Sequence, residues 1–341
     1  MNIKKLTQTT KALFANDKGL LAMDESTATC NKRFAELGIP ETEEARLAWR
    51  ELIITTPNLA KCISGLILYD ETIRQKKEDG TLFVDVIKDA GIIPGIKVDA
   101  GLKDMPGHPG EKVTEGLNGL NGRLAEYFQM GARFAKWRAA FTIGDEIPSQ
   151  DCIEENAKIL AEYALMCQEA GIVPIVEPEV LMDGSHTMEQ CREITEKVLQ
   201  TVFKYLVIKK VALEGIVLKP NMVVAGLDCP VQKSVKEVAD ATVELLMKVV
   251  PANVAGIAFL SGGQSSELAS ERLSVMNAKF KTQLPWPLTF SYSRAIQYPA
   301  LAIWQGKDAN VAAAQESLYH RANLNQAARR GEYKVEMEKS F

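Results

Sequence analysis

A lysine at the end of an apolar segment is the residue of this chain best suited to covalent chemistry. Lys219 closes the run Gly-Ile-Val-Leu-Lys that starts at Gly215, and the run has the β-branched composition of a buried strand. An ammonium in that place either extends to solvent or is dehydrated by its surroundings. Dehydration favours the neutral, nucleophilic amine. Whether Lys219 is exposed or dehydrated can be judged from the other segments that end in polar side chains.

Three further segments carry charged residues two positions apart at the ends of predicted strands. The pairs are Lys97 and Asp99, Lys136 and Arg138, and Glu177 and Glu179. Because side chains alternate between the two faces of a strand, residues at i and i+2 project from the same face. If that face is the interior of a barrel, Lys136, Arg138, Glu177 and Glu179 converge with Lys219. Each pair alone also fits a buried structural ion pair, but so many charges in one volume would perturb pKa values in the directions that catalysis needs.

A second pattern predicts an anion site. Ser261, Gly262 and Gly263 follow an apolar run, and two glycines let the backbone approach an anion with its amide groups as donors. Ser291 and Arg294 follow the next such run, and a guanidinium adds a charged, forked donor. An amine nucleophile, a carboxylate that shuttles protons and a phosphate cradle together fit carbonyl chemistry on a phosphorylated sugar.

Composition excludes several classes of partner. The chain of 341 residues has a formal net charge of −4, with 46% hydrophobic and 25% charged residues, as is usual for a soluble globular protein. This mildly acidic balance offers no electrostatic footprint for nucleic acid or for an anionic membrane, so we predict neither as a partner. No apolar stretch approaches the roughly 20 residues of a membrane span, and the N-terminus lacks the apolar core of a signal peptide.

The cysteines and histidines favour a reduced, metal-free protein. Six cysteines are dispersed without a CxxC pair, which indicates free thiols and a cytoplasmic location. The three histidines, His108, His186 and His320, lie far apart and lack the short ligand spacing of zinc sites. We therefore predict no metal.

Eight short β-branched or aromatic runs alternate with longer amphipathic segments. This alternation predicts parallel strands joined by right-handed crossovers, and the number eight favours a (β/α)8 TIM barrel over an open doubly wound sheet. We expect a single domain over 1–341, with extra N- and C-terminal helices and a short, mobile polar tail at 331–341. The predicted strands are Gly19–Met23, Ile63–Tyr69, Ile92–Val98, Phe134–Phe141, Ile172–Glu179, Gly215–Lys219, Gly256–Leu260 and Pro287–Tyr292.

Six segments, in order along the chain, together resemble class I fructose-bisphosphate aldolases. They are Leu20–Thr27, Phe134–Arg138, Ile172–Val180, Leu218–Met222, Phe259–Gln264 and Thr289–Tyr292. The resemblance implies a (β/α)8 barrel that assembles as a homotetramer and needs no metal or other cofactor. It also implies reversible cleavage of fructose 1,6-bisphosphate, a phosphosugar, to dihydroxyacetone phosphate and glyceraldehyde 3-phosphate, in glycolysis or gluconeogenesis.

The same resemblance implies a role for each matching residue. Lys219 would form a Schiff base with the ketone, and Glu177 would dehydrate the carbinolamine with Glu179 beside it. Asp24 would accept the proton of the C4 hydroxyl, and Lys136 would polarise the site. The ketose 1-phosphate would bind to Ser261, Gly262, Gly263, Ser291 and Arg294, and the 6-phosphate to Ser26, Thr29, Arg33 and Arg138.

Three positions depart from the family pattern. Ala100 stands shortly after Lys97, where the family usually has a second lysine for the distal phosphate. Ser293 precedes the phosphate-binding arginine, where the family commonly has glycine. The chain ends in Phe341, whereas eukaryotic members end in a tyrosine that assists proton exchange.

Two alternatives to a bisphosphate aldolase stay open on these grounds. One is a related lysine aldolase or a transaldolase-like enzyme with its preference shifted toward fructose 1-phosphate. The other is a non-catalytic scaffold on the same frame, since a fold alone does not establish a function. The scaffold predicts a disrupted site, whereas the charged residues at the ends of the predicted strands are all present.

Overall fold

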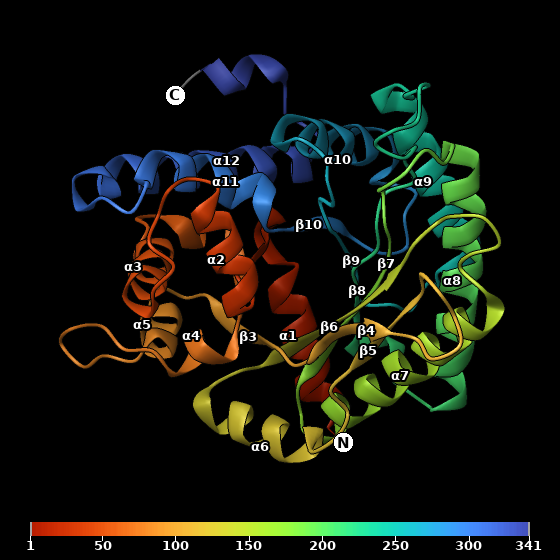
Figure 1. Ribbon diagram of the computed structural model, residues 1–341, viewed down its shortest axis with the longest axis horizontal. Helices are drawn as coiled ribbons and strands as arrows, with labels where there is room; N and C mark the ends of the chain where they lie inside the picture. The colour runs from red at the N-terminus through yellow and green to blue at the C-terminus, as the bar shows by residue number, and fades with distance from the viewer. Residues whose placement is uncertain (1, 340–341) are drawn as a thin grey trace.

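Eight parallel strands close into a barrel in the computed structural model, which describes residues 2–339 (Figure 1). The order around the barrel is β1-β10-β9-β8-β7-β6-β3-β2. The predicted (β/α)8 barrel is thereby confirmed, and each predicted strand is present to within two residues at either end. The strands are β1 Gly19–Ala22, β2 Ile63–Leu68, β3 Ile93–Lys97, β6 Phe134–Phe141, β7 Val173–Val180, β8 Val217–Leu218, β9 Ile257–Phe259 and β10 Leu288–Tyr292.

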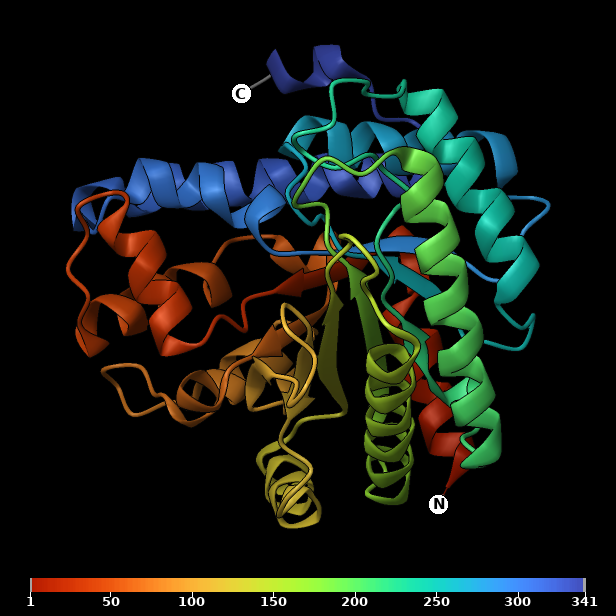
Figure 2. The same cartoon turned by 45° about the vertical axis from the view of Figure 1, so that its right-hand side comes forward.

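Helices surround this barrel and connect its strands (Figures 1 and 2). Helices α8 and α9 start at capping boxes, in which a hydroxyl and a carboxamide or carboxylate satisfy the free amides of the first turn. The predicted extra helices are present, with α1 before the first strand and α12 after α11. The helices are α1 Ile3–Leu13, α2 Thr27–Ala35, α3 Glu43–Ile54, α4 Asp70–Arg74, α5 Phe83–Asp89, α6 Leu120–Met130, α7 Gln150–Glu169, α8 Met188–Ile208, α9 Val235–Val249, α10 Ser266–Phe280, α11 Arg294–Trp304 and α12 Val311–Arg330.

The segment after α12 contacts the body of the protein. Tyr333 is buried, and its hydroxyl donates to a carboxylate oxygen of Glu338 at 2.7 Å. Glu338 lies in the short 3₁₀ helix Val335–Lys339 and pairs with Arg321 of α12. The mobility expected for 331–341 stays a prediction, and Phe341 lies outside the described residues.

A two-stranded antiparallel hairpin between β3 and β6 has no counterpart among the sequence predictions. Its strands are β4 Gly101–Asp104 and β5 Lys112–Glu115. Both are polar, and most of their side chains are partly or fully exposed, so neither shows the alternation of a half-buried strand. Ala100 lies at the entry to this hairpin, where its amide donates to the carbonyl of Glu115 at 2.7 Å.

The inward-facing side of the barrel is apolar near the N-terminal ends of the strands. Leu6 and Leu13 of α1 pack against this apolar layer and close that end of the barrel. Because the side-chain period of a strand is two, the next inward positions along several strands are the charged residues of the predicted site. The strand residues of the layer are Leu20, Ala22, Ile67, Phe134, Val173, Ile175, Val217 and Ala258.

One close approach in this layer requires glycine. A Cβ atom built on Gly95 of β3 would lie 2.2 Å from Cε2 of Phe134, far inside van der Waals contact. Phe134 is fully buried and has no space into which it can move freely. The barrel wall is therefore packed to the point at which one added methyl group must displace an aromatic ring.

We expect Gly95→Ala to lower the free energy of unfolding by about 1–3 kcal/mol through this overpacking. A matched control is Gly122→Ala, an exposed position of α6 where an added Cβ meets no atom within 4 Å. That change should stabilise by about 0.5–1 kcal/mol through helix propensity. Urea unfolding followed by circular dichroism measures both, and equal effects would contradict the packing described here.

Candidate active site

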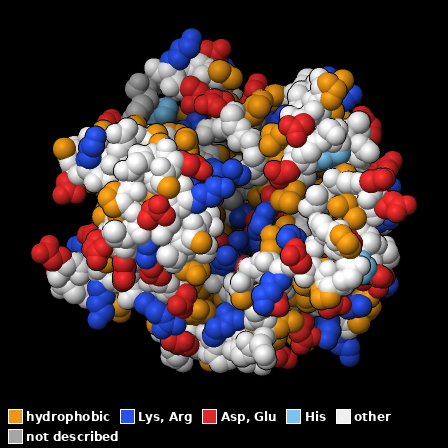
Figure 3. All heavy atoms as spheres, viewed as in Figure 1, with side chains coloured by type: hydrophobic (Ala, Val, Ile, Leu, Met, Phe, Trp, Pro, Cys, Tyr) orange, Lys and Arg blue, Asp and Glu red, His pale blue; other side chains and the backbone are white. Residues whose placement is uncertain are grey.

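A cavity of about 410 Å³ opens at the C-terminal ends of the barrel strands. Lysine and arginine side chains gather in the hollow at the centre of the face seen in Figure 3. Nearly all residues predicted for the site line this cavity. They are Asp24, Ser26, Thr29, Arg33, Lys136, Arg138, Glu177, Glu179, Lys219, Ser261, Gly262, Ser291 and Arg294.

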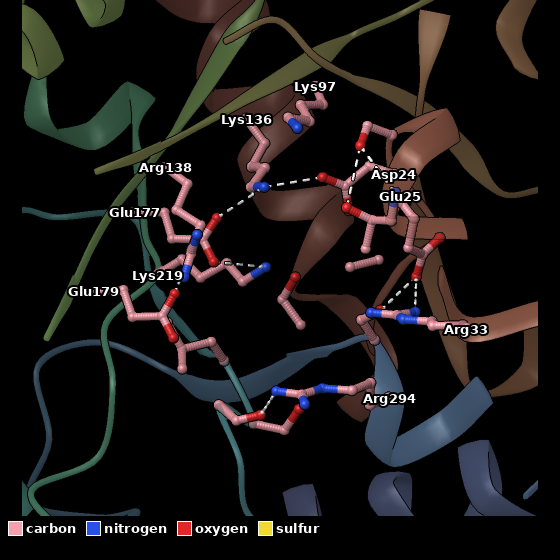
Figure 4. Close-up of a pocket in the computed structure, with 18 of the residues that line it drawn as sticks. Asp24, Glu25, Arg33, Lys97, Lys136, Arg138, Glu177, Glu179, Lys219 and Arg294 are labelled. Atoms are coloured by element: carbon pink, nitrogen blue, oxygen red, sulfur yellow. Dashed lines mark hydrogen bonds and ion pairs between the residues drawn. The ribbon is translucent and has the colours of Figure 1, made fainter. Parts of the chain in front are cut away.

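Four buried charges form a continuous chain across the floor of the cavity (Figure 4). The Lys219 ammonium lies 3.2 Å from Oε1 of Glu177, and the Lys136 ammonium lies 3.3 Å from Oε2 of the same carboxylate. Lys136 also donates to Oδ2 of Asp24 at 2.9 Å. Glu177 is therefore shared by two lysines, and Lys136 is shared by two carboxylates.

Strand geometry places these side chains together. Lys136 and Glu177 follow the inward-facing Phe134 and Ile175 by two residues, so they continue the interior face of β6 and β7. Lys219 lies just beyond β8, and its amide donates to the carbonyl of Val176 at 2.8 Å, which continues the parallel pairing with β7. The apolar layer below dehydrates the site, and the charges above it depend on one another for compensation.

The pKa values in this chain of charges follow from the pairing. Burial alone would raise the pKa of Asp24, but the positive charges of Lys136 and Lys219 outweigh it and hold the pKa below its usual value. Burial alone would lower the pKa of Lys136, but Asp24 and Glu177 outweigh it and raise that pKa. The pairing therefore favours an anionic Asp24 and a cationic Lys136 beside it.

Further polar side chains surround this chain of charges. Arg138 pairs with Glu179 beside Glu177 and Lys219, and the Arg294 guanidinium donates to the carbonyl of Gly262 at 2.5 Å (Figure 4). The hydroxyl of Ser291 is buried and has no hydrogen-bond partner within residues 2–339. An orphaned hydroxyl in the same cavity as the Arg294 guanidinium suits an oxygen atom of a bound anion.

The glycines of the predicted anion loop differ in their placement. Gly262 lines the cavity with a φ of +59°, a left-handed conformation that strains any residue with a Cβ. Gly263 does not line the cavity, and its amide donates to the Met182 sulfur at 2.9 Å. Met182 follows β7, so its thioether joins this loop to the strand that carries the glutamates.

Comparison with known proteins places the chain in a family. The sequence model described as "Fructose-bisphosphate aldolase class-I" matches residues 5–341. The chain belongs to the class-I fructose-bisphosphate aldolase family. It is 53% identical over 336 residues to "Probable fructose-bisphosphate aldolase class 1" of Xanthomonas campestris pv. campestris, which covers 98% of this chain and all of that protein. It is 50% identical over 317 residues to "Fructose-bisphosphate aldolase 6, cytosolic" of Arabidopsis thaliana, covering 93% and 88% of the two chains.

A solved structure agrees with this placement. Fructose-bisphosphate aldolase from Plasmodium falciparum, in complex with TRAP and a small-molecule inhibitor, superposes with a TM-score of 0.95 at 47% sequence identity. The match covers 97% of this chain and 96% of that one. The barrel and the family therefore agree.

Glu25 is a central residue of the site that was not singled out from the sequence. Its buried carboxylate accepts hydrogen bonds from Arg33 at 2.5 Å, Arg50 at 2.6 Å, the Ser293 hydroxyl at 2.6 Å and Gln297 at 2.9 Å. Burial would raise its pKa, but the two arginine charges and the Ser293 hydrogen bond outweigh it and hold the pKa well below its usual range. The serine that departs from the family pattern is thus part of this hub.

Lys97 also lines the cavity and was not among the predicted site residues. Its ammonium lies 3.5 Å from Oδ1 of Asp99 and 6.0 Å from the centre of the Tyr69 ring. Ala100 is exposed and does not line the cavity. The cation on this side of the site is therefore supplied by β3 itself.

Three further features bear on the predictions from composition. Among residues 2–339, no cluster of three or more His, Cys, Asp or Glu side chains is arranged to hold a metal ion. Within the same residues, no helix has both the length and the apolar character needed to cross a membrane. All six cysteines are unpaired and buried.

We expect Glu25→Gln to lower the free energy of unfolding by about 3 kcal/mol at pH 7, because it leaves Arg33 and Arg50 without their carboxylate. The pKa of Glu25 is lowered from its ordinary 4.5, so its contribution is complete above that pH and declines as pH falls below it. The difference between wild type and Glu25→Gln should therefore shrink below pH 4.5. Urea unfolding between pH 3 and pH 7 measures it.

The matched control is Glu126→Gln, an exposed carboxylate that also pairs with an arginine, Arg74. Its effect should be much smaller because water replaces the lost partner. A constant difference for Glu25→Gln down to pH 3 would contradict the assignment of Glu25 as the buried anion.

Proposed function

We propose that this chain catalyses the reversible aldol cleavage of fructose 1,6-bisphosphate to dihydroxyacetone phosphate and glyceraldehyde 3-phosphate through a lysine Schiff base. Membership of the family supports the reaction. The observation that carries the mechanism is the position of Lys219, buried at the floor of the cavity and 3.2 Å from Glu177. A nucleophile within reach of an acid–base group is the arrangement that covalent catalysis requires.

The first half of the reaction forms the Schiff base. The Lys219 ammonium first transfers a proton to the Glu177 carboxylate 3.2 Å away. The resulting amine adds to the C2 ketone, and its nitrogen loses a second proton as the ketone oxygen becomes a hydroxyl. Glu177 then donates a proton to that hydroxyl, which leaves as water while the C2–nitrogen bond becomes an iminium. Lys136, 3.3 Å from the same carboxylate, stabilises the anionic form of Glu177 that remains.

The second half breaks the carbon–carbon bond. Asp24 accepts the proton of the C4 hydroxyl, the C3–C4 electron pair moves into the iminium, and glyceraldehyde 3-phosphate leaves from an enamine. Protonation of the enamine at C3 and addition of water at C2 release dihydroxyacetone phosphate and restore the amine. The lowered pKa of Asp24 keeps it ready to accept the proton, and Lys136 at 2.9 Å orients it.

The two phosphates would occupy opposite walls of the cavity. Ser261, Gly262, Ser291 and Arg294 suit the 1-phosphate, since they offer amides, an unpartnered hydroxyl and a guanidinium. The other wall suits the 6-phosphate because the N-terminus of α2 begins there, capped by Ser26. Ser26, Thr29 and Arg33 line this second wall, and Lys97 and Arg138 line the cavity as well.

The cations of the second wall favour a bisphosphate substrate. Arg33 and Lys97 both line the cavity, although Ala100 lacks the lysine that the family usually has. No observation favours fructose 1-phosphate over the bisphosphate. The complete charge chain likewise favours an enzyme over a scaffold. The family's class I chemistry requires no metal, and we propose none here.

We further propose a single-domain homotetramer in the cytoplasm that serves glycolysis or gluconeogenesis. The buried thiols and the cytosolic relative from Arabidopsis support the location. Apolar side chains exposed on α8 and α9, Val207, Ile208 and Met247, support association between copies.

The test is cleavage of fructose 1,6-bisphosphate, measured as triose phosphate release. We expect Lys219→Met to lower kcat at least about 10⁴-fold, because no other group can form the covalent intermediate. Lys103→Met, an exposed hairpin position, is the control and should leave the rate unchanged. EDTA should have no effect. Full activity of Lys219→Met, or loss of wild-type activity in EDTA, would overturn the proposal.

A further inference from the structure

Arg272 of α10 is a buried cation that pairs with no carboxylate among residues 2–339. The residue is 6% exposed, and within residues 2–339 its Nε has no hydrogen-bond partner. Its hydrogen bond is made by Nη1, which donates to the side-chain oxygen of Gln264 at 2.8 Å. A buried charge is costly unless an anion lies near it, so the absence of a carboxylate needs an explanation.

Gln264 connects this arginine to the cavity wall. Its side-chain nitrogen donates to the carbonyl of Ser261 at 3.0 Å, and its backbone amide donates to the same carbonyl at 3.1 Å. The side chain of Arg272 reaches Gln264 because helical side chains point toward the N-terminus of their helix, and α10 begins directly after this loop. Arg272, Gln264 and Ser261 therefore form one continuous line of hydrogen bonds.

The loop that they hold is the turn of Ser261 and Gly262 that lines the cavity. Arg294 contacts the carbonyl of Gly262, and Met182 packs against Gly263 from the other side. With the carbonyl of Ser261 turned toward Gln264, that oxygen is bound within the protein and kept from an anion. The Gly263 and Gln264 amides are bound within the protein as well. The amide of Gly262 and the Ser261 hydroxyl are therefore the groups of this loop that the turn offers to the cavity.

We propose that Arg272 is a positioning residue for phosphate binding. Through Gln264 it fixes the orientation of the Ser261–Gly263 turn, and its own charge is balanced when a phosphate group occupies that turn. The inference rests on the proposed function, since it needs a phosphorylated ligand at this wall. It assigns a role in phosphate binding to a residue of α10 that does not line the cavity.

Arg329 of α12 supplies a matched comparison. It too is buried, and its Nε too has no partner within the described part of the chain. Its Nη2 donates to the carbonyl of Phe14 at 3.4 Å, and Phe14 packs at Gly256, before β9 begins. Arg329 is therefore a similar guanidinium at the opposite end of the barrel.

The experiment measures the dissociation constant of inorganic phosphate by calorimetry, with KM and kcat for fructose 1,6-bisphosphate, in wild type and variants. We expect Arg272→Met to raise the phosphate Kd and the KM about tenfold while kcat changes less than about twofold. Arg272→Lys keeps the charge and should lie between wild type and Arg272→Met. Arg329→Met should leave the phosphate Kd unchanged. Gln264→Leu, which severs the link but keeps the arginine, should raise both constants as well.

A purely structural role for Arg272 predicts a different result. It would lower thermal stability or kcat without raising the phosphate Kd, and that result overturns the inference. An unchanged phosphate Kd in Gln264→Leu overturns it too, even if Arg272→Met does not fold. If wild type itself binds no phosphate and cleaves no bisphosphate, the proposed function fails together with the inference. If wild type binds phosphate and cleaves the bisphosphate, and Arg272→Met has the same phosphate Kd and KM, the inference is wrong while the proposed function stands.

Discussion

The shared carboxylate of Glu177 is the contact on which the rest of the site depends. It lies between two buried lysines, 3.2 Å from one and 3.3 Å from the other. Each of these charges has been removed from water, so none is stable without its neighbours. The barrel supplies this mutual compensation because its strands bring alternate side chains from β6, β7 and the end of β8 to one axis. Removing one member leaves an uncompensated charge and a misaligned proton path.

The division of the barrel interior explains how the charges are kept apart from solvent. Apolar residues fill the end closed by α1, and the charged residues begin one inward position higher. The same dehydration that makes the charges costly also strengthens their interactions and favours directed proton transfer. Fold stability and catalysis are therefore tied to the same alternation of residues along each strand.

The walls around this floor are organised by carboxylates that hold arginines in place. Glu25 restrains Arg33 and Arg50, and Glu179 restrains Arg138. A guanidinium held on one side keeps its remaining donors for a ligand and loses less conformational freedom on binding. Arg272 differs from these arginines, since its side-chain partner is Gln264 and not a carboxylate. In our proposal it acts on the anion loop through that contact.

The sequence could predict features that depend on local spacing. Eight apolar runs and the i, i+2 pairs at Lys136 and Glu177 were sufficient for the barrel and for the convergence of charges. The Glu25 hub could not be found in this way, because its partners come from α2, α3 and the segment after β10, and only the closed fold brings them together. Lys97 was recognised as a charged residue at the end of the third predicted strand, but it was not assigned to the site. Only the closed fold shows that it lines the cavity.

Schiff-base catalysis requires that the Lys219 nitrogen become covalently bonded to the substrate ketone. Borohydride reduction in the presence of dihydroxyacetone phosphate, followed by peptide mass spectrometry, detects this bond. We expect a single reduced triose phosphate adduct on Lys219 and none on Lys136 or Lys97. An adduct on another lysine, or no adduct under conditions in which the enzyme turns over, would contradict it.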